Sequence, residues 1–158
     1  MTEQYEAEML NLVRARVMLM RKFPCLGYMA LRLDMEVSDE ERVKAGVACT
    51  NGSYIKCSPA LATWPQEHIM TVLAHETLHC ALGHIWRRGE RDRNIWDLAI
   101  NYATNWVLVE QGLEMPPNAD YNRGYTGQAA EQIYADLLRR AVKVSQKDVY
   151  HDPHGEPQ

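Results

Sequence analysis

The segment 74–84 constrains this chain more than any other, because it places two histidines and a glutamate on one short stretch of predicted helix. At about 100° per residue, His75 and His79 lie only some 40° apart on the helix surface, one turn from each other. Both imidazoles can therefore reach one Zn²⁺ ion at the usual Zn–N distance of about 2.0–2.1 Å. Glu76 lies roughly 100° around the helix from His75, beside the ion. This is the placement of a general base for a zinc-bound water.

The residues around this motif indicate that its helix is buried. Apolar side chains flank the motif on both sides: Ile69, Met70, Val72, Leu73, Leu78, Ala81 and Leu82. Buried polar groups need partners, and three such groups on one helix are costly without a metal ion or a hydrogen-bond network. We therefore predict a metal site here, in preference to an exposed helix that carries two histidines by chance.

Length and charge describe a globular protein with one core. The 158 residues suit a single domain, which we place over residues 1–144, with residues 145–158 as a flexible tail. The net charge of −4 argues against a nucleic-acid or anionic-membrane partner, and the arginines within residues 87–93 are interrupted by glycine and acidic residues, which favours a solvated loop. Because neither a membrane-spanning stretch nor a signal-peptide pattern is present, we expect a cytoplasmic protein.

Hydrophobic periodicity predicts a helix and then a strand in the first part of the chain. Residues 3–23 show helical spacing of their apolar side chains: Leu10, Val13, Val17 and Met20. Residues 28–37 alternate between apolar and polar side chains, which predicts a half-buried strand. Together these patterns place the first strand directly after the first helix.

A β-hairpin is predicted over residues 46–58. Asn51 and Gly52 suit a two-residue turn, because this dipeptide tolerates the two positive φ angles of a type I′ turn. In that register Cys49 faces Tyr54, and Cys49 and Cys57 lie on opposite faces of the sheet, which argues against a disulfide between them. The four cysteines include no Cys-x-x-Cys pair, which argues against a four-sulfur zinc site.

Capping residues delimit the remaining helices. Thr63 and Gln66 predict a capping box at the start of the metal-binding helix, and Gly83 suits the left-handed position that ends it. A second long helix is expected over residues 92–111, and a last one over residues 126–144. The order of elements predicts an α+β fold, with a small antiparallel sheet and its hairpin packed on one side of a helical layer.

The third zinc ligand stays open between two residues. A catalytic zinc usually keeps three protein ligands and one position for water. We favour His84 narrowly, because Gly83 ends the helix just before it and lets the imidazole turn back; its alternative role is to cap the helix C-terminus. Asp97 on the next helix is the rival, either as a ligand or as an acceptor that orients a histidine. Asn101, one turn later, is expected to form hydrogen bonds.

A bound zinc ion would make peptide hydrolysis the expected chemistry. Zinc lowers the pKa of its water to about 7 and polarises a substrate carbonyl, while Glu76 takes the proton and returns it to the leaving amine. The strand before the metal-binding helix could offer its edge to an extended peptide. Three tyrosines are candidate donors to the oxyanion, the first of them also a partner of the metal ligands: Tyr102, Tyr121 and Tyr125.

A family resemblance is carried by four groups of residues: Val72–His84, Ile95–Tyr102 with Asn105, Gly112 and Leu113 with Pro116, and Ala130–Tyr134. Together they resemble the zincin-type metallopeptidase domain that is often fused to a von Willebrand A-like domain in bacteria and phages. The resemblance covers most of residues 1–143. It implies a minimal gluzincin- or SprT-like core, a Zn²⁺ cofactor and peptidase activity.

Two features depart from that family pattern. The family carries Asp at the place of Asn101 and Asn at the place of Asp97, so the pair is exchanged here and an acidic ligand on this helix does not carry over directly. The von Willebrand A-like part is not among these residues, which makes a separate von Willebrand A-like partner an expectation.

The sequence thus predicts a zinc-dependent metallopeptidase that acts on peptide or protein substrates. The alternative is a catalytically inactive zinc-binding interaction protein, such as a phage or bacterial accessory protein. Glu76 favours the enzyme, because a purely structural zinc site has no use for a base.

Overall fold

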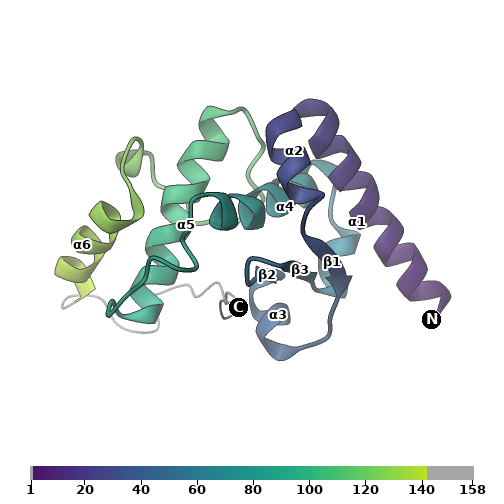
Figure 1. Cartoon of the computed structure of the whole chain (residues 1–158), viewed down its shortest axis with the longest axis horizontal. Helices are drawn as coiled ribbons and strands as arrows, with labels where there is room; N and C mark the ends of the chain where they lie inside the picture. The colour runs from purple at the N-terminus through teal and green to yellow at the C-terminus, as the bar shows by residue number, and fades with distance from the viewer. Residues whose placement is uncertain (1, 142–158) are drawn as a thin grey trace.

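The computed structural model describes residues 2–141 and confirms the α+β class: helices surround one small three-stranded sheet. Figure 1 shows α4 in the middle, with α1 and α2 on one side of it and α5 and α6 on the other. Within the described residues, no helix combines the length and apolar character needed to cross a membrane. The elements in chain order are α1 (Glu3–Lys22), α2 (Pro24–Ala30), β1 (Asp34–Val37), α3 (Glu41–Gly46), β2 (Ala48–Thr50), β3 (Tyr54–Cys57), η1 (Pro59–Thr63), α4 (Gln66–Ala81), α5 (Arg93–Glu110), η2 (Arg123–Tyr125) and α6 (Ala130–Ala141).

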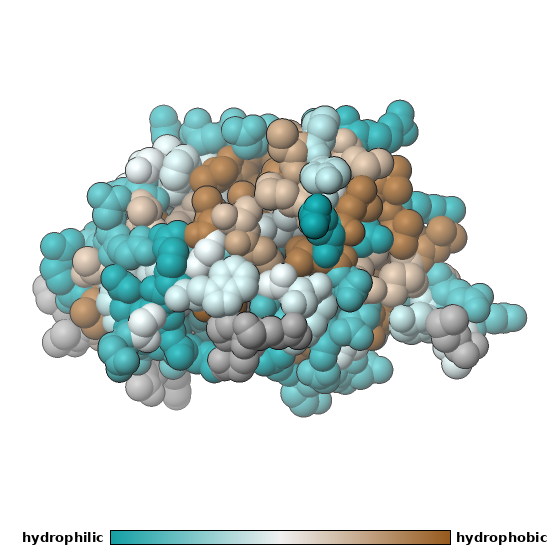
Figure 2. Space-filling model, viewed as in Figure 1, coloured by the Kyte–Doolittle hydropathy of each residue, from teal (hydrophilic) through white to brown (hydrophobic). Residues whose placement is uncertain are grey.

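Helix α1 forms where the periodicity predicts it, but it buries a different face. Leu12, Ala15 and Leu19 are fully buried against the core, whereas the predicted stripe is largely exposed, with Leu10 at 49% and Val17 at 43%. Figure 2 shows apolar residues gathered on the visible surface over α1 and α2. Because α1 carries apolar side chains on more than one face, its neighbours in the fold decide which face is buried.

The strand predicted over residues 28–37 is wrong in its first half, because residues 24–30 form the short helix α2. Pro24 occupies the first position of α2, where its missing N–H is not needed. Gly27 lets α2 approach α1 closely, since a Cβ atom there would lie only 2.1 Å from Met20 Cα. The strand itself begins at Asp34.

The sheet has the order β1-β3-β2, and only its hairpin is antiparallel. Strand β1 runs parallel to β3, which corrects the expectation of an all-antiparallel sheet. Strand β3 is therefore central and paired on both sides, so the edge predicted to receive a peptide is not available.

The hairpin has a longer turn than predicted. Cys49 pairs with Lys56 instead of Tyr54, because the Asn51 side chain accepts hydrogen bonds from the amides of Ser53 and Tyr54 within the turn. The shift of two residues preserves the side-chain alternation, so Cys49 and Cys57 still lie on opposite faces.

Helix α4 is buried from Ile69 to His79, as its apolar flanks predict. The capping box is wrong: Thr63 ends η1 and its hydroxyl donates to the carbonyl of Ala60, and α4 begins after Pro65 without a side-chain cap. The prediction for Gly83 is confirmed, with φ of +69°. The amide of His84 donates to the carbonyl of His79 at 3.0 Å, which completes a Schellman motif.

Helix α5 begins and ends where predicted, and the Asp92 side chain accepts from the amide of Ile95 at 3.0 Å. The last helix begins at Ala130 instead of Thr126, which ends η2. Its predicted end at residue 144 and the tail 145–158 lie outside the described residues. Helices α5 and α6 share a second apolar cluster that includes Trp96, separate from the one formed by α1, α2, α4 and the sheet.

Part of the arginine cluster connects the α4–α5 loop to α6. The Arg87 guanidinium donates to both carboxylate oxygens of Glu131 at 2.7 Å. The Arg91 guanidinium lies over the rings of Trp96 and Tyr134, at 5.3 and 5.7 Å from their centres. These contacts hold α6 against the segment that follows the metal-binding motif.

Candidate metal centre

The two histidines of the motif come together on the buried side of α4. Their Nε2 atoms lie 2.8 Å apart, and the rings meet edge to face with centroids 4.3 Å apart. His75 is 9% exposed and His79 is fully buried. Two buried imidazoles with adjoining nitrogens are what one-turn spacing on a helix produces.

Asn101 of α5 supplies the third polar atom at this point. Its Oδ1 lies 3.1 Å from His75 Nε2 and 3.2 Å from His79 Nε2, so the three atoms form a compact triangle. Helix α5 packs directly against α4, which brings the 1%-exposed asparagine over the histidine pair. The sequence indicated only a general hydrogen-bonding role for this residue.

Asn105, one turn along α5, determines which nitrogen of His75 carries its proton. The Asn105 amide NH₂ donates to the backbone carbonyl of Asp120 at 2.9 Å, so its Oδ1 faces His75 Nδ1 at 2.7 Å. A carbonyl oxygen can only accept, so His75 Nδ1 carries the proton and its Nε2 presents a lone pair. That is the tautomer in which Nε2 can bind a metal ion.

Asp120 also sets the orientation of the Asn101 amide. The NH₂ group of Asn101 donates to Asp120 Oδ2 at 3.2 Å, which leaves Asn101 Oδ1 directed at the histidines. Two lone pairs, on His75 Nε2 and Asn101 Oδ1, therefore converge beside His79 Nε2. Such atoms repel each other unless a proton or a cation lies among them.

The triangle fits a divalent cation that binds nitrogen and oxygen. Donors about 2.0–2.1 Å from a tetrahedral zinc ion lie about 3.3 Å from one another, and the separations in the triangle are 2.8, 3.1 and 3.2 Å. Imidazole nitrogen is a common ligand of zinc, and a carboxamide oxygen is a weaker, neutral one. The chemistry of the donor set is therefore compatible with zinc.

His84 lies on the other side of the His79 ring. Its Nδ1 is 3.1 Å from His79 Nδ1, and Thr104 Oγ1 lies within 3.3 and 3.4 Å of the same two nitrogens. The backbone carbonyl of His84 accepts from the Trp96 indole at 3.0 Å, which anchors this turn on α5. His84 is thus brought to His79, but not to the nitrogen that faces His75.

Asp97 lies one turn before Asn101, with its carboxylate 4.0 Å from the Arg93 guanidinium. Across residues 2–141, no three side chains of His, Cys, Asp or Glu converge in a way that could hold one ion. The structure therefore does not bring either expected third ligand, His84 or Asp97, to the histidine pair as such a set.

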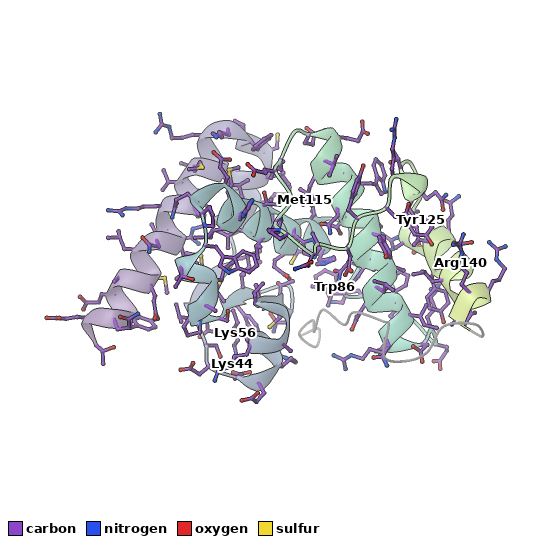
Figure 3. All side chains as sticks on the ribbon, turned by 180° about the vertical axis from the view of Figure 1, so that it is seen from behind. Lys44, Lys56, Trp86, Met115, Tyr125 and Arg140 are labelled. Carbon is purple, nitrogen blue, oxygen red and sulfur yellow. The ribbon has the colours of Figure 1, made fainter. Side chains whose placement is uncertain are left out.

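Glu76 lines a cavity of about 90 Å³ beside His75. Glu76 is 1% exposed. Burial of the Cys57 thiol raises its pKa, and the negative charge of Glu76 is the second cause. The polar lining of the cavity consists chiefly of His75, Glu76, Asn101, Asn105 and Asp120. Its apolar lining includes Val47, Trp64, Val72, Met115 and Pro116. Figure 3 shows the loop with Met115 crossing α4, where it forms one wall.

The tyrosines expected at the site lie apart from this cavity. None of Tyr102, Tyr121 and Tyr125 is among its lining residues. Tyr102 packs against Tyr125, with ring centroids 5.1 Å apart, and the Tyr125 hydroxyl donates to Asp136 at 2.7 Å. Burial, followed by the charge of Asp120, raises the pKa of Tyr102.

Three residues of this cluster were not predicted to contact the site: Thr104, Asn105 and Asp120. Asn105 carried a signal, since it follows Asn101 by one helical turn and so lies on the same face. Asp120 carried none, because it lies in a loop between Gly112 and η2 and reaches the site only through the tertiary fold.

The His-Glu-x-x-His pattern on a helix is typical of zinc metallopeptidases. The chain belongs to the family described as "Putative metallopeptidase domain", whose model matches residues 8–156. It is also similar to an uncharacterized protein of Thermotoga maritima, with 30% identity over 104 residues. That match covers 63% of this chain but 26% of the relative, so the chain spans about a quarter of the relative's length. No solved structure matches this chain.

Proposed function

We propose that this protein is a zinc-dependent metallopeptidase in which His75 and His79 bind the ion through Nε2. The observation that carries the proposal is the convergence of His75 Nε2, His79 Nε2 and Asn101 Oδ1 within 3.2 Å of one another. The proton on His75 Nδ1 supports it, because the hydrogen bond to Asn105 keeps Nε2 available. We assign the third donor position to Asn101.

The proposed role of His84 is to hold His79. A metal-binding histidine almost always has a partner for its other ring nitrogen, and His84 Nδ1 lies 3.1 Å from His79 Nδ1. His84 then orients the ring of His79 without contacting the ion, and Asp97 is likewise left outside the ligand set.

Glu76 is the proposed general base. When bound, zinc would supply a Lewis acid and a water of lowered pKa. Glu76 is buried and lines the cavity beside His75, so it can accept a proton from a water there and deliver it to the leaving amine. Its burial keeps bulk water from competing for that proton.

The proposed substrate is a peptide that places an aliphatic side chain in the cavity. Val47, Val72 and Met115 are apolar residues that line the same cavity. An engineered cavity of about 150 Å³ accepts a benzene ring, so one of about 90 Å³ suits a side chain smaller than an aromatic ring.

The test is Glu76→Gln, assayed with quenched peptides that contain Val, Leu or Gly around the cleavage site. Removing a general base is expected to slow hydrolysis by about 10²–10⁴-fold, while zinc content measured by atomic absorption stays at the wild-type value. His75→Ala should lose both zinc and hydrolysis. Glu67→Gln is the matched control on α4, because that carboxylate is exposed and pairs with Lys22. Unchanged hydrolysis by Glu76→Gln would refute the proposed role.

One observation favours the alternative of an inactive zinc-binding interaction protein. The third donor is a neutral amide where catalytic zinc sites usually have histidine or a carboxylate. Wild-type protein that binds one zinc through His75 and His79 but cleaves none of the peptides would support this alternative over the peptidase.

A further inference from the structure

We propose that Asp120 contributes negative charge to the metal site and acts on it through the amide of Asn101. The proposal rests on the proposed function in one respect, the binding of the ion by His75 and His79. It assigns Asp120 as a positioning residue that acts through Asn101 and is not itself a ligand of the ion.

The donor set itself carries no charge to offset a bound cation. Two neutral imidazoles and one carboxamide oxygen are uncharged, so in this buried place negative charge has to come from carboxylates outside the set, Glu76 in the cavity and Asp120 behind Asn101. The Asp120 carboxylate is hydrogen-bonded to the same amide whose oxygen faces the histidines, with Nδ2 and Oδ2 3.2 Å apart. A charged acceptor on the NH₂ side polarises the amide and increases the negative charge on its oxygen.

The position of Asp120 is determined from two sides. Its backbone carbonyl accepts from Asn105 at 2.9 Å, and its side chain accepts from Asn101. A single loop residue therefore directs the oxygens of both amides, one toward His75 Nδ1 and the other toward the two Nε2 atoms. Loss of the side-chain contact would leave the Asn101 amide able to rotate and present its NH₂ group to the histidines.

The backbone contact makes Asp120→Asn a clean experiment. The substitution has the same shape and keeps the carbonyl that holds Asn105, while the charged acceptor for Asn101 is replaced by a neutral amide. Zinc affinity, measured by competition with a chromophoric chelator, is expected to fall about 10–100-fold, the usual effect of losing a residue that orients a ligand. The visible spectrum of bound Co²⁺ should change with it.

A double-mutant cycle tests whether Asp120 acts through Asn101. Asn101→Ala should weaken zinc binding at least as much as Asp120→Asn. In that background Asp120→Asn should have almost no further effect, because the connecting amide is gone. Equal effects in the two backgrounds would overturn the proposal, since Asp120 would then act independently of Asn101.

The exchange variant N101D/D120N separates charge from shape. It moves the negative charge from position 120 to position 101, beside the histidines, and retains a hydrogen bond between the two positions. Zinc affinity should recover to at least the wild-type value; affinity that stays as low as in Asp120→Asn would contradict the proposal. Thermal unfolding without zinc establishes that each variant is folded.

Two controls keep failure of this inference apart from failure of the proposed function. Glu114→Gln removes one charge from the same loop, where the side chain is exposed and faces His68, and should leave affinity within about threefold. His75→Ala should abolish zinc binding. If it does not, the proposed function is wrong. If it does while Asp120→Asn binds zinc like wild type, only the role of Asp120 is refuted.

Discussion

Two asparagines of α5, one turn apart, contact the histidine pair on the side where catalytic zinc sites usually have a histidine or a carboxylate. An amide can present its oxygen to a histidine and donate its NH₂ group to Asp120 at the same time, which a carboxylate cannot do. Asn101 and Asn105 each have the oxygen toward the histidines and the NH₂ group toward Asp120. The residue type at these positions therefore follows from the need for an oxygen on one side and a donor to Asp120 on the other.

Asn105→Ala should destabilise the protein and weaken zinc binding. It leaves His75 Nδ1–H and the Asp120 carbonyl without these partners, at about 1–3 kcal/mol for each buried group. For the two groups together we expect a loss of about 2–6 kcal/mol in the free energy of unfolding, measured by urea denaturation without zinc. Asn94→Ala, at an exposed position of the same helix, should change it by less than about 0.5 kcal/mol. Equal stability of the two variants would contradict the assigned hydrogen bonds.

Among the elements, the C-terminus of α4 is the one that connects local backbone geometry to the site. Gly83 adopts φ of +69°, and the Schellman hydrogen bonds then place His84 directly after the turn. The same turn is anchored by the Trp96 indole, so α5 fixes it from the other side. The end of one helix thus determines which histidine nitrogen His84 can reach.

Gly83→Ala should cost about 1–2 kcal/mol of stability, because a left-handed conformation is strained for any residue with a Cβ atom. Steric crowding does not cause this loss, since the added Cβ would meet only Arg87 Cδ, at an ordinary contact distance of 3.5 Å. Displacement of His84 should also weaken zinc binding several-fold. Gly112→Ala is the matched control, with φ of +88° at the end of α5. If both variants change zinc affinity alike, His84 does not support His79.

In the whole molecule, the polar cluster lies where two apolar clusters meet. One is built mainly from α1, α2, α4 and the sheet and also includes Leu108 of α5, and the other comes mainly from α5 and α6 (Figure 1). The histidines are held by hydrogen bonds from α5 and the loop at Asp120. The fold around the site therefore has its own apolar cores and does not depend on an ion to bring α4 and α5 together.

Removal of zinc should accordingly leave the protein folded. Zinc at about 100 times its Kd adds about 2.7 kcal/mol of stability, so chelation should lower Tm by about 5–10 °C for a chain of this size. The far-UV circular dichroism spectrum at 25 °C should not change. Unfolding at 25 °C on addition of a chelator would instead indicate a structural zinc site, as in the alternative function.

The comparison with the sequence prediction shows where local information is sufficient. The buried stretch of α4, the α5 helix with its cap at Asp92 and the turn at Gly83 were predicted correctly, because periodicity and capping act within a few residues, whereas the capping box at the start of α4 was wrong. The first half of the predicted strand, the buried face of α1 and the direction of β1 were wrong. Each of these depends on which distant segment covers an apolar surface that two structures could bury equally well.

The candidate site shows the same division between what the local sequence predicts and what the tertiary structure decides. Helix geometry alone brings His75 and His79 to one face with Glu76 beside them, since three fixed positions on a rigid helix need no other part of the chain. The atom that completes the triangle comes from Asn101, 26 residues after His75, and the residues that orient it and His75 are Asp120 and Asn105. No local pattern encodes that meeting, because it is decided by the packing of α5 on α4 and by the return of the loop after α5 onto both.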